Sequence, residues 1–269
     1  MPVNDVVDPA AAAAQLAACV REAGQLALSM FRTTVKQWSK DGASPVCEAD
    51  IAVDRLLRDR LTAAYPGVAW LSEESADDGS RLTARYVWIV DPIDGTRAFL
   101  AGLPDWTVSA ALVESGRPTA AALFAPVTDE FFLASANNGA MCNGTAIAAT
   151  HGASLAQARI AGPKSFIHRL TSIAPDLVVR PRVHSLALRL ARVAQGTLDI
   201  AVAGADSHDW DLAAADLLVH EAGGALTRVG GGTVRYNGTE LRHGILLAAG
   251  RDRLALLNEH LGDERLASL

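Results

Sequence analysis

Apolar residues recur at helical spacing in two stretches of the first 65 residues. Asp8 and Pro9, a typical capping pair, open a stripe that ends near Met30. A second stripe runs from Asp50 to about Ala64, and the Tyr-Pro-Gly that follows it stops a helix. The pattern predicts two amphipathic helices ahead of the first long strand.

The next part of the chain changes to apolar runs of strand length. Residues 86–90 are continuously apolar, which is typical of a strand buried on both faces, and the run ends at Asp91-Pro92. Three shorter runs joined by turn residues follow, and they predict an antiparallel meander over residues 107–113, 119–124 and 131–134.

Beyond about residue 150 the segments alternate differently, and sheets covered by helices are the simplest architecture for this order. We predict strands near Ile160 and over 198–202, 225–229 and 245–249, and helices over 183–194, 209–222 and 251–261. No linker rich in Pro, Ser or charge divides the chain, so we expect an α+β half (1–149) and an α/β half (150–269) packed as one body.

Composition narrows the function classes. The 269 residues carry 24 Lys and Arg against 30 Asp and Glu, a net charge of −6, which disfavours a nucleic-acid binder or a membrane-surface protein. No leader pattern and no apolar run of membrane-spanning length is visible, so a cytoplasmic protein is expected. The three distant cysteines, Cys19, Cys47 and Cys142, are expected to be reduced thiols.

The segment from Asp91 to Thr96 holds the strongest chemical signal. Asp91 and Asp94 flank a proline-fixed turn directly after a buried strand, and Gly95-Thr96 open a helix whose free amides face the same way. Mg²⁺ prefers carboxylate and carbonyl oxygens, so Asp91, Asp94 and the carbonyl of Ile93 are candidate ligands. The alternative is a capped turn in which Asp94 is only the helix cap.

Other acids strengthen the metal interpretation. Glu73 and Glu74 follow a short apolar strand, and strand alternation lets only one of them face the site. Asp50 and Asp211 stand at predicted helix starts, where each alone is explained by the helix dipole. The three-residue spacing of Asp91 and Asp94 differs from the two-residue spacing of aspartyl-phosphate phosphatases, which favours direct attack by a metal-bound water.

Taken together, these motifs resemble those of the inositol monophosphatase superfamily, the magnesium-dependent, lithium-sensitive phosphomonoesterases that include bisphosphate nucleotidases. Four blocks in this order carry the resemblance: Lys40 to Asp50, Ser72-Glu73-Glu74-Ser75, Trp88 to Thr96, and Trp210-Asp211 with Glu221 to Gly224. The resemblance covers nearly the whole chain. It implies a layered αβαβα sandwich of the sugar phosphatase type, with the site between the two halves.

The resemblance also implies roles for individual residues. Glu73, Asp91 and the Ile93 carbonyl would hold one Mg²⁺, while Asp91, Asp94 and Asp211 would hold a second, with a third, looser ion near Glu73. A water activated near Glu73 and Thr96 would attack the phosphorus, with Asp50 supporting the threonine. The substrate phosphate would lie against Asp94, Asp211 and the amides of Gly95 and Thr96, and Mn²⁺ would substitute for Mg²⁺.

Departures from the family pattern bear on the substrate. Cys47 stands where the family usually has threonine, which removes one hydroxyl near Asp50. A glutamate that contacts inositol in the family is replaced by Ala-Gly-Ala at 203–205. Lys164-Ser165 and Arg189 fall where bisphosphate nucleotidases have basic and hydroxyl groups, so a second phosphate could bind there. The alternative is that Arg189 is a solvated helix residue.

These observations favour a magnesium-dependent phosphomonoesterase, a phosphoric monoester hydrolase that acts on a small phosphorylated metabolite such as inositol monophosphate. One alternative is a nucleotidase that removes the 3′-phosphate of adenosine 3′,5′-bisphosphate. Another, of a different class, is a catalytically silent metal- or phosphate-binding protein of the same fold. Because family members are commonly dimers, a homodimer is expected.

Overall fold

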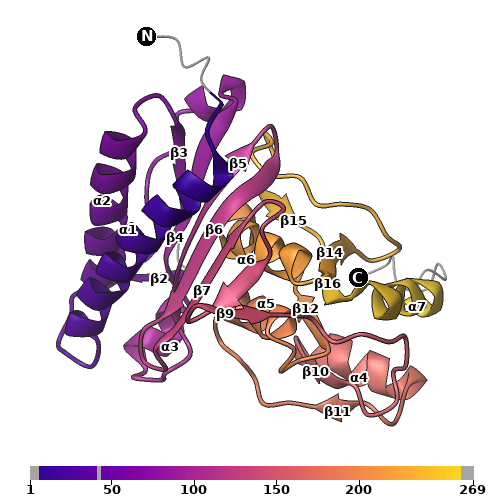
Figure 1. Cartoon of the computed structure of the whole chain (residues 1–269). Helices are drawn as coiled ribbons and strands as arrows, with labels where there is room; N and C mark the ends of the chain where they lie inside the picture. The colour runs from indigo at the N-terminus through magenta and orange to yellow at the C-terminus, as the bar shows by residue number, and fades with distance from the viewer. Residues whose placement is uncertain (1–5, 41–43, 262–269) are drawn as a thin grey trace.

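The protein is built of alternating helix and sheet layers (Figure 1). The structure is a computed structural model, and it describes residues 6–40 and 44–261. Residues 41–43, which belong to the first of the four sequence blocks, lie outside the described residues. None of the described helices is both long and apolar enough to cross a membrane. All three cysteines are free thiols, as expected.

The larger sheet has seven strands in the order β3-β4-β5-β6-β7-β8-β9. β3 pairs parallel with β4, and the other neighbours are antiparallel, which confirms the predicted meander. Its strands are β3 (Ala69–Ser72), β4 (Tyr86–Asp94), β5 (Thr107–Glu114), β6 (Arg117–Ala125), β7 (Glu130–Ser135), β8 (Ala140–Cys142) and β9 (Thr145–Ile147). Alternate residues of β4 pack on opposite faces, since Trp88 and Val90 contact one core and Val87 and Ile89 another.

The second sheet has five strands in the order β11-β10-β12-β16-β14. They are β10 (Arg159–Ala161), β11 (Val178–Val179), β12 (Ile200–Ala203), β14 (Gly224–Arg228) and β16 (Leu246–Gly250). Two short pairs, β1 (Gln37–Lys40) with β2 (Ser44–Cys47) and β13 (Ser207–His208) with β15 (Arg242–His243), stand apart from both sheets.

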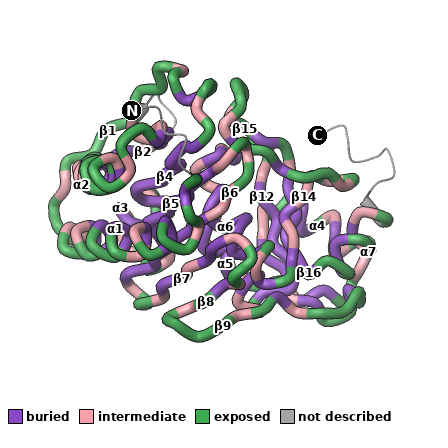
Figure 2. Tube along the Cα trace, turned by 45° about the horizontal axis from the view of Figure 1, so that its top comes forward, coloured by how far each residue is buried: buried purple, intermediate pink, exposed green. Residues whose placement is uncertain are grey.

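Helices separate and cover the two sheets. α1 (Pro9–Met30) and α2 (Glu48–Ala64) cover the outer face of the larger sheet, and α5 (Leu186–Ala194) and α6 (Asp209–Glu221) fill the space between the sheets. α4 (Lys164–Ile173) and α7 (Arg251–Leu261) cover the far face of the smaller sheet. The remaining helices are short: the 3₁₀ helix η1 (Ser80–Thr83) and α3 (Thr96–Leu100). Figure 2 shows the middle strands and α6 buried, and the outer surface of α1 exposed. The predicted αβαβα sandwich is confirmed.

The differences from prediction lie at element ends and in one helix. β4 does not stop at Asp91-Pro92 but continues to Asp94. Pro92 has no amide hydrogen to donate, but β3 ends opposite Val90, so no strand on that side lies opposite Pro92 to accept a hydrogen bond from it. The helix predicted from residue 183 begins at Leu186, behind the N-cap Ser185. The helix α4 is not predicted, since its sequence combines β-branched and small polar residues without an N-cap side chain.

One buried carboxyl group on α6 makes folding stability depend on pH. Asp216 is buried between the sheets and accepts a hydrogen bond from the Tyr236 hydroxyl at 2.9 Å, and its burial raises its pKa to about 6. A raised carboxyl pKa means that the folded state holds its proton more tightly than the unfolded chain. This group therefore costs stability as the pH rises from about 4 through about 6, by roughly 3 kcal/mol in all.

Asp216→Asn should remove that cost. We expect the difference in unfolding free energy between variant and wild type, measured by urea denaturation, to shift in favour of the variant as the pH rises from about 4 to about 7. Parallel stability curves across this range would show that Asp216 titrates normally.

Candidate active site

A β-bulge near the end of β4 brings two aspartates to the same side of the strand. Asp91 is opposite Ser109 and Asp94 is opposite Thr107, so three steps along β4 match two along β5. In a regular strand, side chains three residues apart point to opposite faces of the sheet. A bulge inserts one extra residue, so the side chains of Asp91 and Asp94 point to the same face. The sequence motif thus converges through a bulge in a continuing strand rather than through a terminal turn.

Asp94 is not the cap of the helix that follows it. The N-cap of α3 is Gly95, in the left-handed conformation at φ 96°, which favours glycine. The Oδ2 atom of Asp94 instead accepts hydrogen bonds from the Ser185 hydroxyl and, at 2.6 Å, from the amide of Ala187. Asp94 therefore joins the end of β4 to the start of α5, and the local-cap alternative is wrong.

Asp211 is fixed by the start of α6. Its Oδ2 accepts the backbone N–H of His208 at 2.6 Å, which completes one half of a capping box. Two residues earlier, buried Asp209 accepts the amide of Asn237 at 2.6 Å and lies 2.7 Å from the His243 ring nitrogen Nε2. These contacts hold the first turn of α6 against the β15 segment, and they leave the other oxygen of Asp211 for a ligand.

Asp54 on α2 positions the segment that carries Glu73. Its two carboxylate oxygens accept hydrogen bonds from the hydroxyls of Ser72 and Ser75, on either side of the paired glutamates. The backbone of Glu73 also bonds to the carbonyl of Val90 on β4 at 3.3 Å. Glu73 is half-buried and lines the same pocket as the aspartates.

Asp50 and Thr96 form a hydrogen-bonded pair beside the cluster. Oγ1 of Thr96 lies 3.1 Å from Oδ1 of Asp50 and 3.0 Å from the carbonyl oxygen of Ile93, and its single proton serves one of them at a time. The amide of Cys47 donates to Oδ2 of Asp50 at 2.8 Å. The Cys47 backbone thus supports Asp50. The thiol stays protonated, because burial raises its pKa to about 12.

The three aspartates form a compact, buried group of negative charge. Oxygen atoms of Asp91, Asp94 and Asp211 all lie within 4.8 Å of one another. Burial, and then the charges of Glu73 and the other two aspartates, raises the pKa of Asp91 well above its usual range. Burial and neighbouring carboxylates do the same for Asp211.

A cation fits this group better than any other occupant. Oδ1 of Asp91 is buried, and none of the described residues donates a hydrogen bond to it. Buried polar atoms normally have a partner, and charged oxygens crowded together favour a hard divalent cation. The donor set of carboxylates with one nearby backbone carbonyl, that of Ile93, is all oxygen, as Mg²⁺ or Mn²⁺ requires.

The carboxylates line a pocket of about 420 Å³ together with basic groups. Its lining consists of Pro45, Glu73, Asp91, Ile93, Asp94, Gly95, Thr96, Arg97, Ala98, Arg182, His184 and Asp211. Sequence reasoning did not place Arg97, Arg182 or His184 in the site. His184 is held by Asp105, whose Oδ2 lies 2.7 Å from Nδ1 of the ring and accepts the His184 amide at 2.6 Å.

The structure separates the predicted second-phosphate residues from one another. Arg189 is buried, not solvated, and its guanidinium donates to the carbonyls of Val202 and Val183 at 2.9 and 2.8 Å. It does not line the pocket. Lys164 and Ser165 lie at the start of α4, where they line two other pockets. The structure therefore does not bring Arg189 together with Lys164 in one site.

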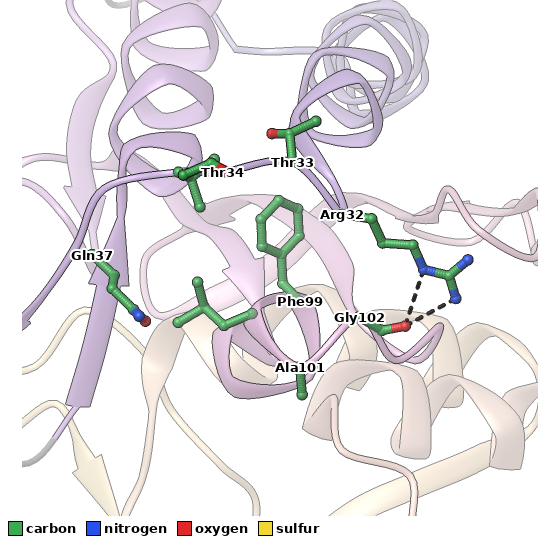
Figure 3. Close-up of a pocket in the computed structure, with 9 residues that line it drawn as sticks. Arg32, Thr33, Thr34, Gln37, Phe99, Ala101 and Gly102 are labelled. Carbon is green, nitrogen blue, oxygen red and sulfur yellow. Dashed lines mark hydrogen bonds between the residues drawn. The ribbon is translucent and has the colours of Figure 1, made fainter.

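A further pocket at the end of α3 offers no comparable chemistry (Figure 3). It is lined by Arg32, Thr33, Thr34, Val35, Gln37, Phe99, Leu100, Ala101 and Gly102. No carboxylate is among these residues, and Arg32 donates through two nitrogens to the Gly102 carbonyl at 3.2 and 3.0 Å. The acidic pocket is therefore the candidate active site.

Comparison with known proteins identifies the family. The model of the inositol monophosphatase family matches residues 7–265. The chain belongs to the inositol monophosphatase family. Membership confirms the resemblance drawn from the four sequence blocks and the expected class, phosphoric monoester hydrolase.

Several known proteins are similar to the chain over most of their length. A histidinol-phosphatase of Mycobacterium tuberculosis is 35% identical over 219 residues, covering 74% of this chain and 83% of the relative. An inositol monophosphatase of Dictyostelium discoideum is 34% identical over 226 residues, covering 79% of this chain and 83% of the relative. The crystal structure of the extragenic suppressor protein suhB of Bartonella henselae superposes with a TM-score of 0.84 at 27% identity, covering 94% of this chain and 99% of that one.

Proposed function

We propose that this protein is a magnesium-dependent phosphomonoesterase that cleaves a small phosphorylated metabolite by direct attack of water. The observation that carries the proposal is the buried group of Asp91, Asp94 and Asp211, with one carboxylate oxygen that has no donor among the described residues. Its position in a pocket that also contains Thr96 and basic side chains supports phosphate chemistry. A silent binding protein would not need the Asp50–Thr96 pair beside the cluster.

The proposal assigns two to three Mg²⁺ ions to named residues. Glu73, Asp91 and the Ile93 carbonyl would hold the first, and Asp91, Asp94 and Asp211 the second, with a looser third ion near Glu73. When bound, the ions polarise the phosphate, lower the pKa of a water and neutralise the leaving alkoxide. Mn²⁺, which accepts the same oxygen ligands, would substitute.

The remaining groups orient the reactants. The Thr96 hydroxyl would hold the attacking water and pass its proton toward the buried Asp50 carboxylate, which is 3.1 Å away. The amides of Gly95 and Thr96 would bind the substrate phosphate. Asp94 would keep its orientation through Ser185 and the start of α5, so the site depends on the packing of α5.

The proposed substrate is a phosphomonoester of the inositol monophosphate type. Ala203, Gly204 and Ala205 supply no carboxylate for inositol hydroxyls, and they line a small pocket together with Phe166 and Ile245. Because no carboxylate stands at these positions, the proposal extends to phosphate esters of alcohols other than inositol. The proposal also includes a cytoplasmic homodimer, which rests on the family resemblance.

Lithium gives an independent test of the proposed chemistry. We expect millimolar Li⁺ to inhibit phosphate release from inositol 1-phosphate at saturating Mg²⁺, as in lithium-sensitive relatives, while the same concentration of Na⁺ has no effect. A flat lithium titration of an enzyme that is otherwise active would contradict the proposed arrangement of two to three ions.

A further inference from the structure

A histidine in the active-site pocket has no part in the proposed metal and phosphate contacts. His184 lines this pocket of about 420 Å³, and the other basic side chains that line it are Arg97 and Arg182. Both arginines are exposed, whereas His184 is half-buried, with 33% of its side chain exposed. The half-buried ring therefore has less freedom than the arginines to move away from a bound molecule.

Asp105 orients the His184 ring. Its Oδ2 atom accepts the His184 backbone amide at 2.6 Å and lies 2.7 Å from Nδ1 of the ring. A carboxylate only accepts hydrogen bonds, so Nδ1 carries the proton of the neutral imidazole, and Nε2 is then an acceptor. The two ring nitrogens point in diverging directions, so Nε2 points away from Asp105. None of the described residues bonds to Nε2, and this nitrogen is therefore open to a molecule bound in the pocket.

The backbone beside His184 lies directly against the turn at Gly95. The amide of Ser185 donates to the carbonyl of Asp105 at 3.1 Å. Gly95 packs on both groups, since a Cβ atom at Gly95 would lie 3.4 Å from the Asp105 carbonyl oxygen and 3.4 Å from the Ser185 nitrogen. Gly95 supplies one of the amides proposed to bind the substrate phosphate. His184 therefore lies next to a phosphate ester bound at that turn.

The alcohol part of such an ester needs a polar contact that the metal ligands do not supply. The pocket has the volume of a small-molecule site, which leaves room for an alcohol beside the phosphate. Ala203, Gly204 and Ala205 line a different pocket. Guanidinium groups suit phosphate oxygens, whereas a neutral imidazole nitrogen suits a hydroxyl group. Among the described lining residues that hold neither metal nor the attacking water, His184 is the side chain that can accept a hydrogen bond.

We propose that Nε2 of His184 accepts a hydrogen bond from a hydroxyl group of the alcohol that the enzyme releases, and that Asp105 positions the ring for this contact. The inference rests on the proposed phosphomonoesterase function, and it specifies the substrates as phosphate esters of alcohols with a further hydroxyl near the ester. An alcohol without that hydroxyl covers Nε2 and leaves it without a partner, which weakens binding. His184 is thus a specificity-determining residue outside the metal site.

The test compares two esters with the same carbon ring. Inositol 1-phosphate carries hydroxyl groups on the ring and cyclohexyl phosphate carries none, and both are assayed by phosphate release in Mg²⁺. The wild type should prefer inositol 1-phosphate, and in His184→Ala the ratio of its kcat/KM to that of cyclohexyl phosphate should fall about three- to tenfold. His184→Gln, whose amide oxygen can accept in place of Nε2, should restore part of the preference. His151→Ala, at an exposed histidine, is the control and should keep the wild-type ratio.

The ring nitrogens of His184 give a second readout that does not depend on turnover. Their ¹⁵N NMR signals, identified by their absence from the His184 variants, should show the proton on Nδ1. The Nε2 signal should shift more with inositol 1-phosphate than with cyclohexyl phosphate when either is added in Ca²⁺, in which we expect no turnover.

Three results would overturn the proposal: a wild type without preference, equal losses for both esters in His184→Ala, or equal responses of the Nε2 signal to the two esters. If neither ester releases phosphate in Mg²⁺, the proposed function fails, and the Nε2 signal alone then decides this inference. A larger response to inositol 1-phosphate supports the contact, whereas equal responses or none contradict it.

Discussion

Asp91→Asn should abolish phosphate release while making the metal-free protein more stable. Asp91 is buried beside two other aspartates, and Oδ1 has no hydrogen-bond donor among the described residues. Removing its charge relieves the cost of burying that charge and its repulsion from the neighbouring carboxylates, the two causes that raise the pKa of Asp91. The same change removes the carboxylate assigned to both metal ions, which should lower kcat by about 10³-fold or more if the lost interaction is worth several kcal/mol.

Activity and thermal unfolding together separate this result from simple damage to the fold. The measurements are kcat in Mg²⁺ and the Tm in EDTA, for wild type, Asp91→Asn and the exposed control Asp59→Asn on α2. The control should match wild type in both. Asp94→Asn should also lose activity, but with less gain in stability, since Asp94 holds Ser185 and Ala187. Wild-type turnover of Asp91→Asn would refute the assigned role.

Magnesium should stabilise the metal-free protein, and more strongly as the pH rises. The raised carboxyl pKa values of Asp91 and Asp211 mean that the folded state keeps their protons longer than the unfolded chain. Their ionisation therefore destabilises the metal-free fold as the pH rises above the ordinary carboxyl range. A bound cation needs these groups ionised and offsets their repulsion, so the stabilisation by Mg²⁺ grows with pH.

The expected size follows from mass action. At a Mg²⁺ concentration about a hundred times Kd, binding adds about 2.7 kcal/mol, which corresponds to a rise in Tm of about 5–10 °C. The measurement is Tm with and without Mg²⁺ at pH values from about 5 to about 8. Addition of Mg²⁺ should raise the Tm of Asp91→Asn much less than the Tm of the wild type. A Mg²⁺ effect that is equal at every pH, or equal in the variant, would contradict binding at the aspartates.

The apolar pattern predicted most of the fold because the layers bury whole strand and helix faces. The continuous run from Tyr86 to Val90 lies in a strand with helices on both sides, so both of its faces are apolar. The bulge between Asp91 and Asp94 was not predicted, because Pro92 is typical of a strand end. Only the pairing with β5 and the early end of β3 show that the strand continues.

The acids of the site could be found from the sequence, but the groups that orient them could not. Asp91, Asp94 and Asp211 stand in short motifs at element ends. Ser185 is 91 residues from Asp94 in the sequence. A serine ahead of an apolar run indicates a helix N-cap, but it does not indicate a hydrogen bond to so distant an aspartate. Asp105 and His184 are likewise 79 residues apart.

Arg189 shows why the substrate contacts were harder to predict. A helix with one apolar stripe is expected to have a solvated opposite face. α5 instead lies between two sheets, where its other side is buried too, so Arg189 bonds to backbone carbonyls. Lys164 and Ser165 lie on α4, a helix that was not predicted, so nothing in the sequence indicated where they lie relative to Arg189.

The most direct test of the proposed function is phosphate release from inositol 1-phosphate and from adenosine 3′,5′-bisphosphate, followed after EDTA treatment and then during a titration with Mg²⁺. We expect no release in EDTA, full recovery with Mg²⁺ or Mn²⁺, and inhibition by Ca²⁺, which is larger and less suited to octahedral sites. Full activity in EDTA after dialysis, or no release from any phosphomonoester at saturating Mg²⁺, would contradict it.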